Sequence, residues 1–470
     1  MKARLTCFLL GFCLTGVVAV IPVSGQDKNP PDQTTQASAA APAAPQDQGG
    51  APAQGGAPAA APAPAPAPPT WSIGPIDFSG AIDGYYSWNS EHPITKTNEL
   101  YAWDAPTNTF SLNMAKLAMS HSPDPVGFEF DLMYGNTATL IGAAAASDTF
   151  FDKFVEQAYV SYKPAKAKGF EVDFGKFVTT AGAEVVEDWS NWNYSRSLLY
   201  TWAIPIFHFG LRTSWPMGKH LTSGVQIVNG WNNDFSANSR ATVGANIMAT
   251  YAKWSLMEDW YGGEDNEVIT ATNAGNKGWR NLFDTVLTLT PSSKLSAYVN
   301  YDYGMNRNYG LSFTDEFPNE TTTTFFKDGS LAKWQGVGAA IHYQATAKWA
   351  FTPRFEVFDD PEGFALNGLD TAETTFSGTF TDHGIIDVPI RQTVKEITVT
   401  GEYKLLEGLL WRAEYRYDWS NEPFFVRGVG TEPFCHGSTI ATCPAGYGLQ
   451  NSKDENTITI AFIGFFGPKR

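Results

Sequence analysis

The chain has 470 residues and a formal net charge of −16; 17% of its residues are charged and 14% are aromatic. This many aromatic residues exclude a mainly disordered chain, and the acidic balance argues against a nucleic-acid-binding protein. After residue 25 no apolar run approaches the roughly 18–20 residues of a membrane-spanning helix, so a helical membrane protein is excluded. A β-barrel in a membrane and a large secreted β-protein both fit this composition.

Residues 1–25 have the pattern of an export signal. Lys2 and Arg4 precede an apolar stretch at residues 5–20, and small side chains close the segment at Ser24 and Gly25. We therefore predict a signal peptide that is cleaved before Gln26. A retained membrane anchor is the alternative.

Residues 26–70 form a second region, rich in alanine and proline. Positions 37–69 hold 15 Ala and 9 Pro, and no aromatic residue occurs between Phe12 and Trp71. Such a segment cannot bury a core, and its prolines favour an extended chain. We predict a disordered periplasmic tail or linker, either an inert spacer or a tether that contacts the cell wall.

From residue 71 to residue 470, apolar and polar residues alternate with a period of two. In 409–419 apolar and aromatic residues occupy every odd position, and Arg412, Glu414, Arg416 and Asp418 occupy even positions. Strands with two different faces produce this pattern, whereas a helix needs apolar spacings of three and four. The class predicted is all-β.

Sixteen strands are predicted, with 14 or 18 as alternatives, and 253–262 is the weakest of them. They are 76–89, 109–121, 125–135, 153–163, 169–178, 204–216, 219–230, 240–252, 253–262, 279–290, 293–304, 331–345, 347–359, 391–404, 407–419 and 455–466. Seven short connections alternate with eight long ones, near 90–108, 136–152, 179–203, 231–239, 263–278, 305–330, 360–390 and 420–454. Strict alternation of loop length indicates an antiparallel up-and-down transmembrane barrel, with short periplasmic turns and long outer loops.

Several blocks of the chain resemble a known family. They are residues 76–86, 154–160, 173–177, 195–200 and 226–231. Together they are similar to the outer-membrane β-barrel porins called OmpL-like, over roughly residues 71–466. The resemblance implies a barrel in the outer membrane of a Gram-negative bacterium and passive passage of solutes, without naming a substrate. The chain departs from the usual ending of outer-membrane proteins, because Phe466 is followed by Gly-Pro-Lys-Arg.

The predicted channel is lined by the charged residues of the strands, because a charge that faces lipid is costly. The pore-lining candidates are Glu129, Asp131, Glu171, Asp173, His208, Arg212, Arg354, Glu356, Glu396, Glu402, Arg412, Glu414, Arg416 and Asp418. Arg212, Arg354, Arg412 and Arg416 form either a cationic strip or, with neighbouring carboxylates, a neutralised structural ladder.

The third long loop, 179–203, either folds into the pore or packs its aromatic residues on the barrel rim. By analogy with general porins, an inward third loop with acidic residues sets the constriction. The constriction-loop candidates are Glu184, Glu187, Asp188, Trp189, Trp192 and Arg196.

Other chemistry is sparse in the sequence. Cys7 and Cys13 leave with the signal peptide, so Cys435 and Cys443 are predicted to form a disulfide in the last outer loop. We expect no cofactor and no metal: Asn232-Asn233-Asp234 and residues 262–267 both lack the spacing of a calcium loop. No enzyme motif occurs, so no catalytic residue is predicted.

The function predicted is that of an outer-membrane porin for diffusion of small polar solutes or ions, with outer-membrane lipids as its surroundings and three barrels as a possible homotrimer. The net charge weakly favours cations. The alternative is a surface-anchoring or adhesive barrel with a closed lumen, acting through its long outer loops. A barrel enzyme and a soluble β-protein are the remaining classes.

Overall fold

The computed structural model describes residues 71–93, 96–144, 150–236, 239–264, 279–314, 322–366, 391–425, 434–435, 448–449 and 452–467. The predicted signal peptide, the Ala/Pro-rich tail and Cys443 of the predicted disulfide lie outside these residues. Large parts of the outer loops 360–390 and 420–454 do as well.

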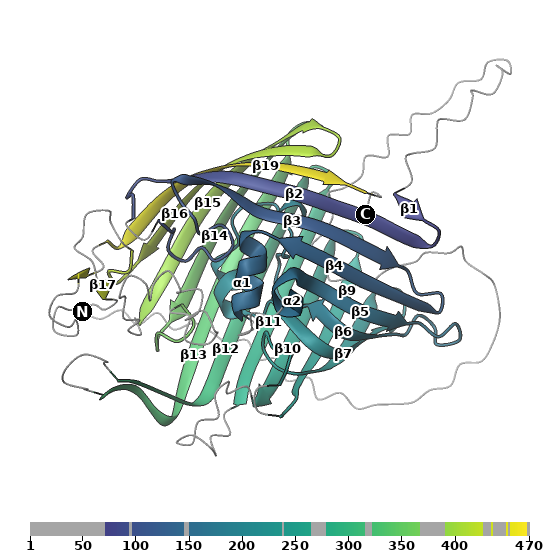
Figure 1. Cartoon of the computed structure of the whole chain (residues 1–470), viewed down its shortest axis with the longest axis horizontal. Helices are drawn as coiled ribbons and strands as arrows, with labels where there is room; N and C mark the ends of the chain where they lie inside the picture. Colours follow the sequence, from purple (N-terminus) through teal and green to yellow (C-terminus); the bar gives the residue numbers. More distant parts are fainter. Residues whose placement is uncertain are drawn as a thin grey trace. The chain divides into compact units, whose positions relative to one another are not determined.

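A closed antiparallel barrel of sixteen strands makes up most of the described chain (Figure 1). Each strand pairs with the next, and the last pairs with the first through Ile460 and Tyr86. The strands are β2 (Ile76–Asn89), β3 (Thr109–His121), β4 (Val126–Tyr134), β5 (Val155–Tyr162), β6 (Glu171–Val178), β7 (Phe207–Pro216), β8 (Leu221–Val228), β9 (Thr242–Tyr251), β10 (Trp254–Glu264), β11 (Trp279–Ser292), β12 (Leu295–Thr314), β13 (Thr322–Gln344), β14 (Trp349–Asp360), β15 (Gln392–Leu406), β16 (Leu409–Ser420) and β19 (Asp454–Phe466). The predicted fold class and strand number are confirmed.

Three short strands lie outside the ring. β1 (Ser72–Ile73) pairs with the start of β2. β17 (Phe434–Cys435) and β18 (Gly448–Leu449) pair with each other in parallel.

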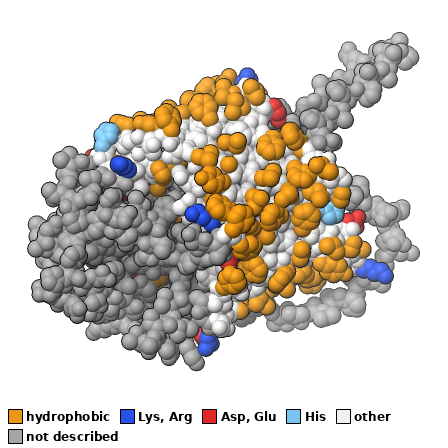
Figure 2. All heavy atoms as spheres, in the orientation of Figure 1, with side chains coloured by type: hydrophobic (Ala, Val, Ile, Leu, Met, Phe, Trp, Pro, Cys, Tyr) orange, Lys and Arg blue, Asp and Glu red, His pale blue; other side chains and the backbone are white. Residues whose placement is uncertain are grey.

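The two faces of each strand differ as a membrane barrel requires. In β14, Phe351 and Phe355 are 45% and 46% exposed on the outside, whereas Arg354 between them is 1% exposed. Figure 2 shows apolar side chains covering much of the visible outer wall. A soluble β-protein turns its apolar face inward, so this orientation excludes that alternative for the barrel.

Two features of the long connections differ from expectation. The connection 305–330 was expected to be a loop, but β12 continues to Thr314 and β13 begins at Thr322. The ladder between them continues, with register shifts, so that prediction was wrong. The connection after β4 carries two short helices, α1 (Asn136–Ala144) and α2 (Phe150–Phe154), which strand alternation did not reveal.

The helices are short elements between strands. Within the described residues, no helix is long and apolar enough to cross a membrane.

The outward face of β12 offers a test of membrane depth. Val299 and Leu295 are both exposed and apolar, and Leu295 is the first residue of the strand. We expect Val299→Arg to destabilise the barrel by about 2–4 kcal/mol, and Leu295→Arg by about 0–1 kcal/mol, because the cost of a lipid-facing charge falls toward the membrane interface. Urea unfolding in phospholipid vesicles measures both, and equal costs would contradict the assigned depth.

Candidate functional site

The predicted pore-lining side chains all lie on the inner face of the barrel. Glu171, Arg212 and Glu402 are half-buried there, and the others are buried. The buried set is Glu129, Asp131, Asp173, His208, Arg354, Glu356, Glu396, Arg412, Glu414, Arg416 and Asp418. Period-two alternation therefore placed these residues on the correct side of the wall, and their part in permeation stays a prediction.

Two inner arginines of β14 and β16 share one carboxylate. Nε of Arg354 lies 2.7 Å from Oε1 of Glu396, and Nε of Arg416 lies 2.9 Å from Oε2 of the same carboxylate. Arg354 also reaches Glu184 at 2.8 Å, and Arg416 reaches Asp418 at 2.8 Å. These contacts are those of a neutralised ladder rather than of a free cationic strip.

The other two arginines are paired in the same way. Nη2 of Arg412 lies 2.7 Å from Oε2 of Glu402, and Nε of Arg212 lies 2.8 Å from Oδ2 of Asp173. Each pair joins neighbouring strands, β15 with β16 and β6 with β7. The inner wall thus couples opposite charges across the ladder.

The connection between β6 and β7, residues 179–206, enters the barrel and is called the inner loop below. Wall carboxylates accept hydrogen bonds from its backbone. Glu414 accepts from the N–H groups of Tyr194 at 2.6 Å and Ser195 at 2.9 Å, and Glu356 accepts from that of Leu198 at 2.6 Å. A segment inside a barrel has no strand partner, so these contacts satisfy donors that would otherwise be buried without partners.

Wall arginines do the same for carbonyl groups of the inner loop. Arg412 donates to the carbonyls of Asp188 at 2.7 Å and Asn191 at 2.6 Å. Arg416 donates to the carbonyl of Arg196 at 2.8 Å. Such charge-assisted hydrogen bonds are stronger than neutral ones, which holds this segment against the β16 wall.

The acidic candidates of the inner loop have basic partners. Asp188 pairs with Arg196, and Glu187 pairs with Lys116 of β3, which also contacts Asp131 and Glu156. Burial acts to raise the pKa of the Glu187 carboxyl, but the ammonium group of Lys116, together with a backbone hydrogen bond and Arg196, outweighs burial and holds that pKa below its ordinary value. Glu187 is therefore an ionised anchor of the inner loop at neutral pH.

The tryptophan candidates of the inner loop also contact the wall. Trp192 stacks against Tyr298 of β12 and His342 of β13, with ring centroids 5.3 Å and 5.4 Å away. Trp189 is half-buried and packs near Leu410 of β16. All six constriction-loop candidates are thus brought together inside the barrel, so the rim-packing alternative does not describe them.

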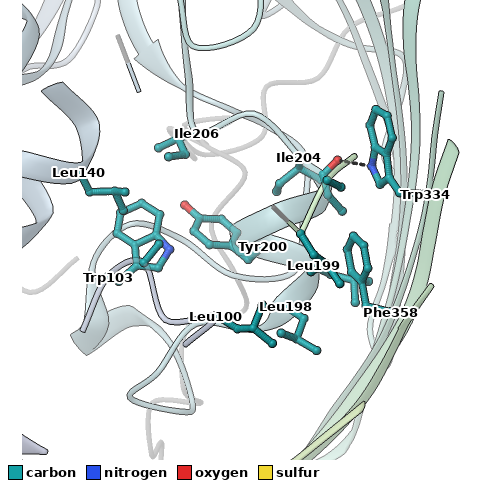
Figure 3. Close-up of a cluster of buried hydrophobic side chains, with 14 of the residues drawn as sticks. Leu100, Trp103, Leu140, Leu198, Leu199, Tyr200, Ile204, Ile206, Trp334 and Phe358 are labelled. Carbon is teal, nitrogen blue, oxygen red and sulfur yellow. Dashed lines mark hydrogen bonds between the residues drawn. The ribbon is translucent and has the colours of Figure 1, made fainter. Parts of the chain in front are cut away.

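An apolar cluster inside the barrel was not predicted from the sequence (Figure 3). Leu199 and Ile204 of the inner loop meet Trp334 of β13 and Phe358 of β14, and the indole N–H of Trp334 donates to the carbonyl of Ala203 at 3.0 Å. The connection after β2 adds Leu100 and Trp103, and α1 adds Leu140. The lumen is therefore partly a packed core, although alternation predicted only polar lining.

Further buried carboxyl groups were not among the predicted pore-lining residues, although three of them lie on predicted strands. Asp104, in the connection after β2, is 2% exposed. Burial, reinforced by Glu414, raises the pKa of Asp104 to about 7 despite two nearby arginines. Asp259, Asp284 and Asp302 lie on β10, β11 and β12 and are equally buried.

Comparison with known proteins places the chain in a family. The family model described as "Putative beta-barrel porin-2, OmpL-like" matches residues 75–443, and the chain belongs to this family. It is therefore an outer-membrane porin, and its family and fold are those of a channel rather than of an enzyme. The predicted localisation and the predicted family resemblance are confirmed.

No relative among the curated proteins matches the sequence. Among solved structures, in-vitro folded OmpT of Vibrio cholerae is similar over 83% of this chain and 97% of its own, with 11% identity and a TM-score of 0.47. The outer membrane channel DcaP of Acinetobacter baumannii is similar over 83% and 97%, with 10% identity and a TM-score of 0.46. OmpF of Salmonella typhi, in complex with daunomycin, is similar over the same shares, with 12% identity and a TM-score of 0.47.

The ion pairs of Arg354 predict a large effect on stability. We expect Arg354→Met to destabilise the barrel by roughly 3–5 kcal/mol, because it leaves the buried carboxylates Glu184 and Glu396 with one cation fewer. Lys404→Met is the control, since Lys404 pairs with Glu407 at the surface, and we expect it to cost less than about 1 kcal/mol. Urea unfolding in vesicles compares the two, and similar costs would show that the buried ladder does not hold the barrel together.

The raised pKa of Asp104 predicts a pH dependence. The unfolded chain ionises this carboxyl near pH 4 and the folded barrel near pH 7, so wild-type stability contributed by Asp104 falls between these values as pH rises. Asp104→Asn does not titrate, so we expect its stability relative to wild type to increase from pH 4 to pH 7 and then to level off. Unfolding of both proteins at several pH values measures this, and a constant difference would refute the shifted pKa.

Proposed function

We propose that the barrel passes small polar solutes and ions by passive diffusion, that the inner loop sets its narrowest part, and that it prefers cations. The porin family and the sixteen-stranded ring support a channel. The many contacts between the inner loop and the wall support a fixed obstruction that narrows this channel. Because its charged side chains and its backbone groups both bind the wall, the inner loop keeps one conformation while solutes pass.

The preference for cations follows from the distribution of paired and unpaired charges. Six inner-wall cations pair with carboxylates of the described chain: Lys116, Lys176, Arg212, Arg354, Arg412 and Arg416. In contrast, Asp259, Asp284 and Asp302 form no ion pair with any described residue. Negative charge that is not cancelled inside a low-dielectric wall attracts cations and repels anions. This asymmetry is the observation that carries the proposal.

A small cavity supports a route beside the inner loop on the same wall. Its lining includes Glu184 and Trp192 of the inner loop, Thr288 of β11 and Tyr298 of β12. Thr288 and Tyr298 are paired in register and share the inner face with Asp284 and Asp302. We place the passage between the inner loop and β11–β12.

The assembly of the porin stays a prediction. The apolar outer wall contacts outer-membrane lipids, as expected for a membrane barrel. The homotrimer and the contact of the Ala/Pro-rich tail with the cell wall remain proposals from the sequence.

Electrical recording tests the proposed function. We expect the detergent-purified full chain to give stable conductance steps in planar bilayers, and a reversal potential in a KCl gradient whose sign shows K⁺ moving more easily than Cl⁻. Folded, heat-modifiable protein that gives no steps would contradict the channel. Conductance steps with a preference for Cl⁻ would contradict the proposed cation preference but not the proposed channel.

A further inference from the structure

Three aspartates stand in one row across adjacent strands of the inner wall. Asp259 of β10 is directly opposite Asp284 of β11, and Asp284 is directly opposite Asp302 of β12. Asp259 is 3% exposed and the other two are 0% exposed. Like charges directly opposite on neighbouring strands destabilise a sheet, so this row needs a compensating partner.

The protein supplies donors to two of the three carboxylates. Asp259 accepts from the hydroxyl of Thr180 at 2.6 Å, and Asp284 accepts from the N–H of Gly182 at 2.9 Å and from the amide of Asn300 at 2.7 Å. These donors are neutral, so they orient the oxygens without cancelling their charge.

Asp302 is the group that lacks a donor. Neither of its carboxylate oxygens receives an N–H or O–H from any residue in the described chain, although both oxygens are buried. Its carboxyl group lies within hydrogen-bond reach of the carboxyl group of Asp284. Two acceptor-only groups in contact need either a shared proton or a cation between them.

The rest of the inner wall shows how this chain normally treats buried carboxylates. Glu396 lies between Arg354 and Arg416, and Asp173 accepts from Arg212. No arginine or lysine of the described chain forms an ion pair with the row on β10–β12. A cation from solution can supply this positive charge, and a shared proton is the alternative that the experiment below tests.

We propose that Asp284 and Asp302 bind a hard divalent cation such as Ca²⁺ or Mg²⁺, with Asp259 at the edge of the same site. Ions of this kind take several oxygen ligands, including carboxylates and water, and two adjacent carboxylates supply both charge and ligands. The cavity between the inner loop and β11–β12 is lined by Thr288 and Tyr298, which lie on the same strand faces two inward positions from Asp284 and Asp302.

The proposed site shares the inner face of β11 and β12 with the proposed passage, so the charge of a bound ion reduces the flow of monovalent cations. This consequence rests on the proposed function. The binding itself does not, since the row exists whether or not the barrel conducts.

Calorimetric titration of the detergent-purified full chain with CaCl₂, and separately with MgCl₂, tests the site. We expect binding of one ion of at least one of the two metals, and at least tenfold weaker binding in Asp302→Asn. Asp284→Asn is a second variant, and heat-modifiability on gels shows that each barrel is folded. Glu258→Gln is the matched control: Glu258 is exposed, adjacent to Asp259 in sequence and on the outer face, and we expect it to bind within twofold of wild type.

The outcomes separate the site from the channel. Absence of binding to the folded wild-type barrel overturns the proposal and leaves a shared proton as the compensating partner. Unchanged binding in both Asp302→Asn and Asp284→Asn also overturns it, because the ion then binds elsewhere. Binding that the two variants lose, in a barrel that gives no conductance steps, supports the site and contradicts only the proposed function.

A second readout concerns permeation. If the proposed function holds, we expect Ca²⁺ to lower the K⁺ conductance of wild type and Glu258→Gln, and to leave that of Asp302→Asn unchanged. Equal inhibition of all three would overturn the placement of the ion on the passage.

Discussion

A polypeptide segment that crosses the inside of a barrel must satisfy its backbone hydrogen bonds without a strand partner, and this structure depends on how that is done. The inner loop is satisfied by charged side chains of the wall, with Glu414 and Glu356 holding N–H groups and Arg412 and Arg416 holding carbonyl groups. The inner-wall charges of β14 and β16 therefore have a structural role, because they fix the position of the inner loop.

This constraint also explains why the arginines do not make the lumen cationic. An arginine that serves a loop carbonyl is buried, and a buried cation is tolerated only beside carboxylates, as Arg354 is beside Glu184 and Glu396. On the β14–β16 side of the lumen, the positive charges of the arginines are thus cancelled by neighbouring carboxylates. On the β10–β12 side, Asp284 accepts from the N–H of Gly182 and Asn300 accepts from the N–H of Ala183, and no ion pair among the described residues involves Asp284.

Alternation and loop parity predicted the wall from sequence because a lipid-facing strand must be apolar on one face at every second residue. Even the weakest predicted strand, 253–262, corresponds to β10 (Trp254–Glu264). The continuation of β12 to Thr314 was missed, since the polar residue Arg307 occupies an outward position and interrupts the alternation. The inner loop was found by its length and its acids, whereas the apolar cluster around Trp334 depends on contacts between connections far apart in sequence.

The aspartate row shows why a site on a barrel wall escapes motif analysis. Each strand contributes a single carboxylate that, alone, is an ordinary inner-face residue. Asp284 and Asp302 are joined by a tight turn, so their pairing could be counted from the sequence to within a residue or two. Asp259 and Asp284 are joined by a long connection, which leaves their register free until the barrel closes. Closure of the barrel sets the shear between strands. The alignment of the three aspartates in one row therefore depends on the whole barrel and not on any one segment of the sequence.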